Sequence, residues 1–154
     1  MKKQNPRSGL EKIYFRLKQD EDKYPPTPWE SMWGRRIENN IFEIDNIPFY
    51  AMDVSPGDKV KAELVSGRYE YRTTTSRSGN SVFRVYVYDE SKIPAARERF
   101  RRIGIQSELG KGKLFAIEIP ARVDIEPVLE LLMHGQDNGE WDIEEGSLRH
   151  LVPD

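Results

Sequence analysis

Hydrophobic and polar residues alternate along several short stretches of the first half of the chain. The stretch KIYFRLK places Ile13, Phe15 and Leu17 on one side, with the period of two that is typical of a half-buried strand. Residues 29–44 predict two strands around a turn at Asn39 and Asn40, and residues 59–65 and 68–75 predict two more. Such short, closely spaced strands predict a small barrel-like domain. The positions expected to be buried in residues 29–44 are Trp33, Ile37, Phe42 and Ile44.

The stretch DNIPFYAMDVSPGDKV, residues 45–60, interrupts this alternation with an apolar run followed by a turn. Pro56 favours a turn, Gly57 accepts a positive φ, and the Asp58 side chain can accept a hydrogen bond from the nearby main chain. We therefore expect the segment IPFYA to close an end of the barrel. Packing is the favoured role for Phe49 and Tyr50, because apolar clusters mostly form core.

The second half of the chain has a different pattern. Residues 81–89 predict a strand, and residues 91–104 predict a helix with Ser91 as N-cap, Ile93, Ala96, Phe100 and Ile103 on one face, and Gly104 as its end. A hairpin around GKGK follows, then a helix capped by Asp124, and a last strand from Trp141. The order β-α-β-β-α-β is that of a ferredoxin-like domain, so the predicted class is α+β.

A ferredoxin-like sheet carries both helices on one face, which assigns a direction to each strand residue. We expect the helix-covered face to hold Phe83, Val85, Val87, Phe115, Ile117 and Ile119. We expect the opposite face to hold Arg84, Tyr86, Tyr88, Leu114, Ala116 and Glu118. The predicted organisation is a mobile arm at 1–10, a β-rich domain at 11–79 and a ferredoxin-like domain at 80–154.

Composition and charge narrow the class of protein. The chain has 154 residues, a formal net charge of −2 and no cysteine, which excludes disulfides and thiolate metal sites. Residues 1–79 carry 14 basic and 12 acidic side chains, whereas residues 80–154 carry 10 and 14. The chain has neither a signal peptide nor an apolar run of membrane-spanning length, so we expect a cytoplasmic protein.

Candidate catalytic and metal-binding motifs are weak. His134 and His150 are the two histidines, and neither has a partner at metal-ligand spacing. The GKGK stretch lacks the spacing of a phosphate-binding loop and lies between two strands. We therefore expect no enzyme, no metal and no cofactor.

Acidic residues are concentrated near the carboxyl end. They favour a basic protein partner over nucleic acid, because phosphate binding requires clustered Lys and Arg. Trp141 lies among them, as an aromatic anchor of an interface would. The predicted partner-binding residues are Asp137, Glu140, Trp141, Asp142, Glu144 and Glu145.

The open face of the predicted sheet suggests two other functions. A small molecule or nucleotide would bind between the two domains, in a pocket lined by Phe49, Arg84, Tyr86 and Tyr88. RNA would stack on Tyr86 and Tyr88, but the chain has Lys113 and Glu118 where the RNA-recognition pattern requires aromatic residues. Nucleic acid is therefore the least favoured partner.

Three stretches, DEDKYPPTPWESMW, IFEIDNIPFYAMDVSPGDKV and SGNSVFRVYV, occur in this order and spacing. In these motifs the chain resembles the bacterial domain-of-unknown-function family 4265, from about Glu11 to His150, with less specific similarity after Asp89. The resemblance implies a small, cytoplasmic, cofactor-free bacterial protein, and assigns no catalytic residues. Some members look like immunity proteins encoded beside polymorphic or contact-dependent toxins.

The leading hypothesis is therefore a non-enzymatic immunity protein, or antitoxin, that neutralises a cognate toxin, for example a basic nuclease domain, through its acidic surface. The alternative is a small-molecule or nucleotide sensor. A metabolite that raises the melting temperature would favour the sensor, whereas protection against a neighbouring toxin would favour the immunity protein.

Overall fold

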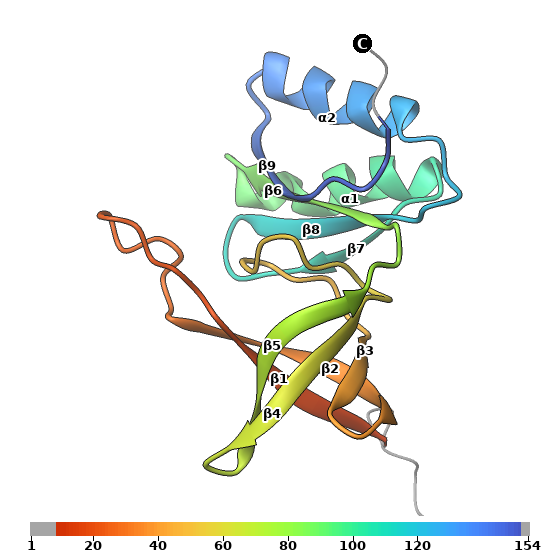
Figure 1. Cartoon of the computed structure of the whole chain (residues 1–154). Helices are drawn as coiled ribbons and strands as arrows, with labels where there is room; N and C mark the ends of the chain where they lie inside the picture. The colour runs from red at the N-terminus through yellow and green to blue at the C-terminus, as the bar shows by residue number, and fades with distance from the viewer. Residues whose placement is uncertain (1–8, 152–154) are drawn as a thin grey trace, which may run out of the picture.

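The computed structural model describes residues 9–151, so residues 1–8 of the predicted mobile arm lie outside the described residues. A ring of five strands is followed by a four-stranded sheet that carries two helices (Figure 1). The first five strands are β1 (Leu10–Arg16), β2 (Trp29–Glu38), β3 (Ile41–Ile44), β4 (Lys59–Val65) and β5 (Arg68–Ser76). The predicted α+β class is confirmed, and β1 begins inside the segment expected to be an arm.

Strands β1 to β5 form a closed barrel in chain order. Consecutive strands are antiparallel, and a short parallel contact between Ile13 of β1 and Tyr69 of β5 closes the ring. Alternate residues point inward, as the sequence pattern predicts. The fully buried positions of this core include Ile13, Met32, Phe42, Val60 and Ala62.

Two residues that were expected in the barrel core lie elsewhere. Ile37 is 46% exposed, because the pairing of β2 with β3 shifts register between Arg36 and Glu38 and the alternation is lost there. Trp33 is partly exposed on the outer face, opposite Lys12 in the register of β1 and β2. Phe42 and Ile44 are buried, as predicted.

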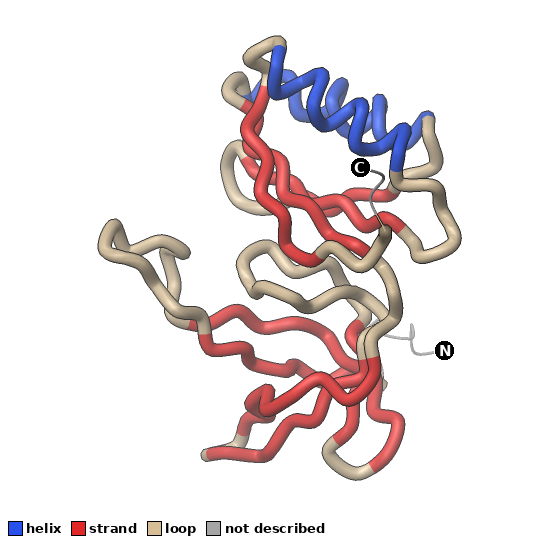
Figure 2. The backbone as a smooth tube through the Cα atoms, turned by 45° about the horizontal axis from the view of Figure 1, so that its top comes forward, coloured by secondary structure: helices blue, strands red, loops and turns tan. Residues whose placement is uncertain are grey.

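The second half of the chain builds the antiparallel sheet in the order β7-β8-β6-β9. Both helices cover one face of this sheet (Figure 2), and the six residues predicted to face them all belong to the shared core. The order β-α-β-β-α-β is therefore confirmed. The elements are β6 (Ser81–Val87), α1 (Ile93–Arg102), β7 (Gln106–Leu109), β8 (Leu114–Ile119), α2 (Glu126–Asp137) and β9 (Trp141–Ser147), with a short 3-10 turn at Glu90–Lys92.

Of the three predicted helix ends, two are correct. Gly104 ends the first helix with a φ of +81°, and Asp124 accepts a hydrogen bond from the N–H of Glu126 (3.0 Å). Ser91 is not the N-cap. Asp89 accepts from the Ser91 N–H (3.1 Å) and starts a 3-10 turn that precedes α1. Ile103 lies beyond the last helical turn and is 41% exposed, although it was expected on the buried face.

The connection between β3 and β4, residues 45–58, lies between the barrel and the open face of the sheet (Figure 1). Ala51 and Val54 are buried in the barrel core, with Tyr50 packed against it, so the prediction that this segment closes the barrel is confirmed. Ile47 and Phe49 point the other way and pack on Val82 and Ala116 of the sheet. We call residues 45–58 the junction loop.

The predicted turn at the end of the junction loop is also confirmed. Gly57 has a φ of +84°, and the Asp58 carboxylate accepts the Ser55 N–H at 3.0 Å. The same carboxylate accepts the N–H of Ser78 at 2.9 Å, which brings the end of the barrel to the turn. Asp58 is fully buried, so these hydrogen bonds and an arginine described below satisfy its charge.

Candidate functional site

The junction loop is held from the barrel side by a buried carboxylate. Glu30 of β2 is 8% exposed, and its two oxygens accept hydrogen bonds from three consecutive backbone N–H groups, those of Phe49 (2.7 Å), Tyr50 (3.1 Å) and Ala51 (2.7 Å). Charge-assisted hydrogen bonds of this kind are stronger than neutral ones. They fix the backbone of residues 49–51, which sits between the two sheets.

The same three residues are held from the sheet side by a buried guanidinium. Arg84 of β6 is fully buried and donates to the carbonyl oxygens of Phe49 (3.0 Å) and Ala51 (2.5 Å). Its Nη1 lies 3.8 Å from the Glu144 carboxylate of β9. Burial lowers the pKa of Arg84, and the negative charge of Glu144 opposes this effect.

Gly146 makes room for this guanidinium, because a Cβ at that position would lie 2.1 Å from Arg84 Nη1. Arg84 therefore has a structural role at the junction. This corrects the expectation that Arg84 lines an open ligand pocket, because its donors already bind backbone carbonyls and no part of the side chain is exposed.

A second arginine ties the carboxyl end of the chain to the same loop. Arg149 donates to both oxygens of Asp58 (3.1 and 3.0 Å) and lies 3.3 Å from Asp53. Asp53 also pairs with Arg77 at 2.8 Å. The junction loop therefore holds together segments that lie more than ninety positions apart, as the separation of Asp58 and Arg149 illustrates.

The tyrosines of the open sheet face have different surroundings. The Tyr86 hydroxyl contacts the hydroxyl of Tyr24, which belongs to the connection between β1 and β2. Burial raises the pKa of Tyr86, and the hydrogen bond to Tyr24 raises it further. Tyr88 is 52% exposed, and a hydrogen bond to Asp142 raises its pKa. Phe49, Arg84, Tyr86 and Tyr88 therefore do not line one pocket, contrary to the expectation.

A cavity of about 440 Å³ does lie at the junction, with other residues in its wall. It is bounded by the barrel, by the connection that carries Tyr24, by the junction loop and by β9. Burial raises the pKa of Glu144, although Arg84 and Tyr24 act in the opposite direction, and burial also raises the pKa of Tyr24 and Tyr50. The wall includes Phe15, Tyr24, Tyr50, Met52, Tyr71 and Glu144.

A second cavity, of about 640 Å³, lies on the other side of Tyr50. Trp29 and Glu30 of β2, Phe49 of the junction loop and the turn between β7 and β8 contribute to its wall. Of the predicted pocket residues, Phe49 borders this cavity between the barrel and the sheet. The arrangement of buried charge, aromatic groups and hollow space makes the junction the candidate ligand site.

The model of the family described as "Domain of unknown function (DUF4265)" matches residues 30–143. The chain belongs to this family. The predicted resemblance is thus confirmed, over a shorter range than the one expected from Glu11 to His150. No curated protein matches the chain significantly.

A solved structure has the same fold as this DUF4265 protein. It is described as "Novel crystal structure of a hypothetical protein from Neisseria gonorrhoeae" and superposes with a TM-score of 0.74 at 16% sequence identity. The match covers 90% of this chain and 95% of the Neisseria chain. At this identity the likeness shows the fold alone.

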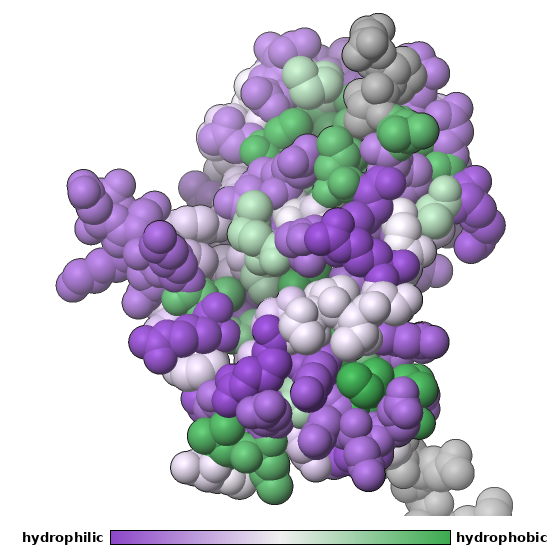
Figure 3. All heavy atoms as spheres, viewed as in Figure 1, coloured by the Kyte–Doolittle hydropathy of each residue, from purple (hydrophilic) through white to green (hydrophobic). Residues whose placement is uncertain are grey.

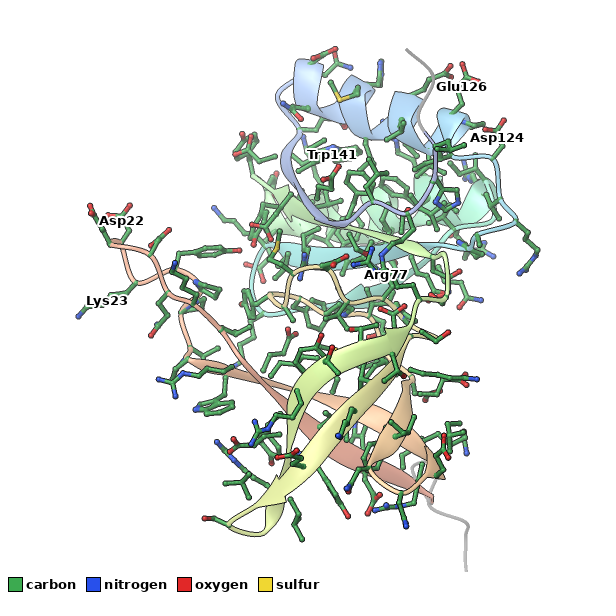
Figure 4. All side chains as sticks on the ribbon, in the orientation of Figure 1. Asp22, Lys23, Arg77, Asp124, Glu126 and Trp141 are labelled. Atoms are coloured by element: carbon green, nitrogen blue, oxygen red, sulfur yellow. The ribbon has the colours of Figure 1, made fainter. Side chains whose placement is uncertain are left out.

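Trp141 of the DUF4265 protein lies in the core and not on a surface (Figure 4). It is 1% exposed, its Nε1 donates to the Leu132 carbonyl at 3.0 Å, and its ring packs on Phe100 with centroids 5.9 Å apart. The ring also covers Gly135 of α2, where a Cβ would lie 2.0 Å from Trp141 Cζ2. This placement corrects the expectation that Trp141 is an exposed anchor.

The predicted acidic residues do not form one continuous surface. Glu140 pairs with Arg99 of α1 at 2.9 Å, and Glu144 turns into the junction towards Arg84. Asp137, Asp142 and Glu145 are exposed. Asp142 and Glu145 belong to β9, the outer strand of the sheet, and Asp137 is the last residue of α2.

The two histidines lie apart from the junction. His134 is exposed near the end of α2 and contacts Asn138 at 2.9 Å. His150 lies 2.6 Å from the Ser81 hydroxyl through Nδ1 and 2.9 Å from the Pro120 carbonyl through Nε2, so both ring nitrogens fasten the carboxyl-terminal segment to β6 and β8. Among residues 9–151, no cluster of three His, Asp or Glu side chains could hold a metal ion.

Sequence reasoning missed Glu30, Tyr24 and Tyr71. Glu30 stands at an inward position of a barrel strand, where the alternation calls for an apolar residue. A charged residue at such a position indicates a buried charge with a specific partner. Tyr24 and Tyr71 gave no such signal, because their approach to β6 and to the barrel end depends on tertiary structure. Residues 9–151 contain no helix that is both long and apolar enough to cross a membrane.

Proposed function

We propose that this DUF4265 protein is a non-enzymatic, cytoplasmic immunity protein that neutralises a positively charged bacterial toxin domain through the acidic rim of its sheet. We define the acidic rim as Asp137, Asp142 and Glu145. The observation that supports the proposal best is that all three carboxylates are exposed along β9 and the helix end that precedes it.

The position of β9 supports a protein partner. It is an edge strand, paired with β6 on one side alone, so its other side offers backbone groups to a strand of a partner. Carboxylates beside such an edge attract a basic protein and raise the rate of encounter. Glu140 and Glu144 contribute less, because arginines of the same chain already neutralise them.

Co-expression with the toxin domain encoded beside the gene tests the proposal. Reversing the acidic rim with Asp137→Lys, Asp142→Lys and Glu145→Lys should abolish protection of the host cell. Glu21→Lys, Asp22→Lys and Glu130→Lys change the net charge equally at exposed sites elsewhere and should leave protection intact. Full protection by the rim variant would refute the assignment of this surface.

The junction cavity supports a second candidate function, the binding of a small molecule. Its volume of about 440 Å³ lies within the range of small-molecule sites, and its wall combines aromatic rings with a carboxylate whose pKa burial raises. A screen of metabolites by thermal shift should find a ligand that raises the melting temperature. Tyr50→Ala would remove one wall and should abolish that shift.

The outcomes of these two tests differ. If the rim variant fails to protect and no metabolite raises the melting temperature, the immunity proposal stands alone. If a metabolite binds and the rim variant protects fully, the protein is a small-molecule sensor.

We assign residues 80–154 to a ferredoxin-like domain and residues 11–79 to a barrel domain. The sheet order β7-β8-β6-β9 with antiparallel neighbours and both helices on one face supports the first assignment.

A further inference from the structure

The outer face of the barrel carries large aromatic and basic side chains on neighbouring strands. Because Ile13 and Phe15 point inward, the alternate residues Lys12, Tyr14 and Arg16 of β1 point outward. In the same way β2 points Met32 inward and Trp29 and Trp33 outward. We define the barrel face as Lys12, Tyr14, Arg16, Trp29, Trp33 and Arg68.

The register of the strands brings these residues into contact. Lys12 lies directly opposite Trp33, and Arg16 lies directly opposite Trp29. Lys12 Nζ is 5.4 Å from the Trp33 ring centroid, and Arg16 Cζ is 5.7 Å from that of Trp29. These distances are those of cation–π contacts.

Arg68 of β5 joins the two strands on this face. Its Cζ lies 4.3 Å from the ring centroid of Trp29 and 4.6 Å from that of Tyr14, so one guanidinium contacts both rings. Cation–π contacts at exposed sites contribute about 0.5–1 kcal/mol each. This stabilisation explains why the cations lie beside the rings. It does not explain why three large rings lie on the outside of the barrel. The barrel core does not need these rings, because other residues fill it.

The charge of the barrel face is positive although the whole chain has a net charge of −2. Three of these six residues are cations, and the acid Glu70 lies beside them, opposite Tyr14 in the register of β1 and β5. Glu70 pairs with Arg68 at 3.3 Å. Within residues 9–151, neither Lys12 nor Arg16 forms an ion pair, and both are exposed.

We propose that the barrel face binds single-stranded nucleic acid. Single strands are recognised by a basic surface that follows the backbone and by aromatic rings on which successive bases stack. Here Trp29 and Trp33 are four residues apart on one strand, roughly 13 Å at the usual rise per residue, and Tyr14 lies on the neighbouring strand. The cations beside each ring contact the phosphates.

The chemistry of the face favours a single strand over the other polyanions. A duplex hides its bases from the rings, and an acidic protein or a lipid headgroup offers charge without planar groups to stack. The sequence predicted nucleic acid as the least favoured partner because Lys113 and Glu118 replace aromatic residues of the RNA-recognition pattern and the net charge is negative. The basic residues of the barrel face are scattered along the chain. Strand pairing clusters them, which is the condition that phosphate binding requires.

Fluorescence titration of the full chain tests the proposal with two probes, oligothymidine and oligouridine of about 12 nucleotides, in about 50 mM salt. Stacking on Trp29 and Trp33 should quench their emission saturably, and the buried Trp141 should supply a residual signal that does not change. Comparison of the two oligomers tells whether DNA or RNA binds more tightly. The absence of saturable quenching with both oligomers would overturn the proposal.

Two variants test the two parts of the surface. Trp29→Ala with Trp33→Ala should weaken binding at least about tenfold, since loss of stacking affects every base that contacts the rings. Because this variant lacks the two quenched tryptophans, its affinity is measured from the fluorescence anisotropy of a dye-labelled oligomer, with the parent protein measured in the same way. Lys12→Ala with Arg16→Ala should reduce the slope of log affinity against log salt by about 1.4, as expected for the loss of two phosphate contacts on a single strand. The second variant keeps both tryptophans, so it remains informative if the first one fails to fold.

The matched control is Lys59→Ala with Lys61→Ala, which removes two exposed lysines from β4 of the same barrel. It should keep both the affinity and the salt slope. Equal losses in the control, or equal binding of a duplex of the same length, would indicate unspecific attraction and overturn the proposal. Binding to vesicles with anionic lipid, without binding to either oligomer, would overturn it as well. The acidic rim takes no part in any of these measurements, so this proposal and the immunity proposal fail independently.

Discussion

Trp141 and the pair Trp29 and Trp33 form a useful comparison, because the structure gives Trp141 and Trp33 the reverse of the roles that the sequence predicts. Trp141 stands among acidic residues and was expected on a surface, yet it is 1% exposed between α2 and the sheet. Trp33 was expected in the barrel core, yet it is partly exposed on the barrel face with Trp29. The ring of Trp141 packs on Gly135, whereas the rings of Trp29 and Trp33 have cations beside them.

The comparison shows that the tertiary contacts of a side chain, more than the residues next to it in sequence, decide whether it is buried. Acidic residues flank Trp141 along β9, but the alternation of a strand turns Asp142 and Glu144 to the face opposite Trp141. Arginines show the same contrast, since Arg84 is buried at the junction whereas Arg16 is exposed on the barrel face. Substitutions at interior and exterior positions should therefore differ in their effect on stability.

The largest effect is expected for Trp141→Ala. Removing a buried aromatic side chain leaves a cavity, and the free energy of unfolding should fall by about 3–5 kcal/mol. Trp33→Ala, the matched change at the barrel face, should cost clearly less, because Trp33 is partly exposed and the space that its side chain leaves is open to water. Urea denaturation measures the free energy of unfolding of both variants. Equal losses would show that Trp33 stabilises the fold as much as the buried Trp141 does.

Arg84→Met should be nearly as damaging. It removes the donor to two backbone carbonyls and the partner of Glu144, and breaking a buried charged contact on one side costs about 3–5 kcal/mol. Arg16→Met, the same change at an exposed position, should leave the free energy of unfolding within about 1 kcal/mol of the parent. A stable Arg84→Met variant would mean that Glu30 alone holds the junction loop.

Gly135→Ala should destabilise the protein by about 1–3 kcal/mol, because its Cβ would meet the Trp141 ring at 2.0 Å. Alanine normally strengthens a helix relative to glycine, so a loss here measures the contact with the ring. The double variant Gly135→Ala with Trp141→Leu should lose less than the sum of the two single changes. Simple additivity would show that the two positions do not interact.

The smallest effect concerns pH and Glu144. Burial raises the pKa of Glu144, so the folded protein binds this proton more tightly than the unfolded chain does. The contribution of Glu144 to stability should therefore be present below the ordinary glutamate pKa and should be lost as the pH rises through the folded pKa. Glu144→Gln removes this dependence, and urea denaturation between about pH 4 and about pH 8 measures the change in slope. An unchanged slope would show that Glu144 titrates alike in both states.

The strands and helices could be predicted from the sequence because their signals are local. Ile13, Phe15 and Leu17 alternate, Asn40 and Gly57 take positive φ values of 61° and 84°, and Gly104 ends a helix. The register shift after Arg36 could not be predicted, so Ile37 was misplaced. Of the predicted partner-binding residues, Asp137, Asp142 and Glu145 are exposed, as expected, whereas Trp141 is buried and lies outside the acidic rim.

The order of the elements, the inward faces of most strands and the turn that ends the junction loop can all be predicted from local sequence. These features follow from backbone geometry and from the period of apolar residues, which act over a few positions. The meeting of Glu30 and Arg84 on residues 49–51, the packing of Trp141 on Gly135, and the gathering of cations from β1 and β5 beside the tryptophans of β2 all depend on the tertiary structure. Such contacts join residues far apart in the chain, and their energies depend on burial and strand register, which no local pattern records.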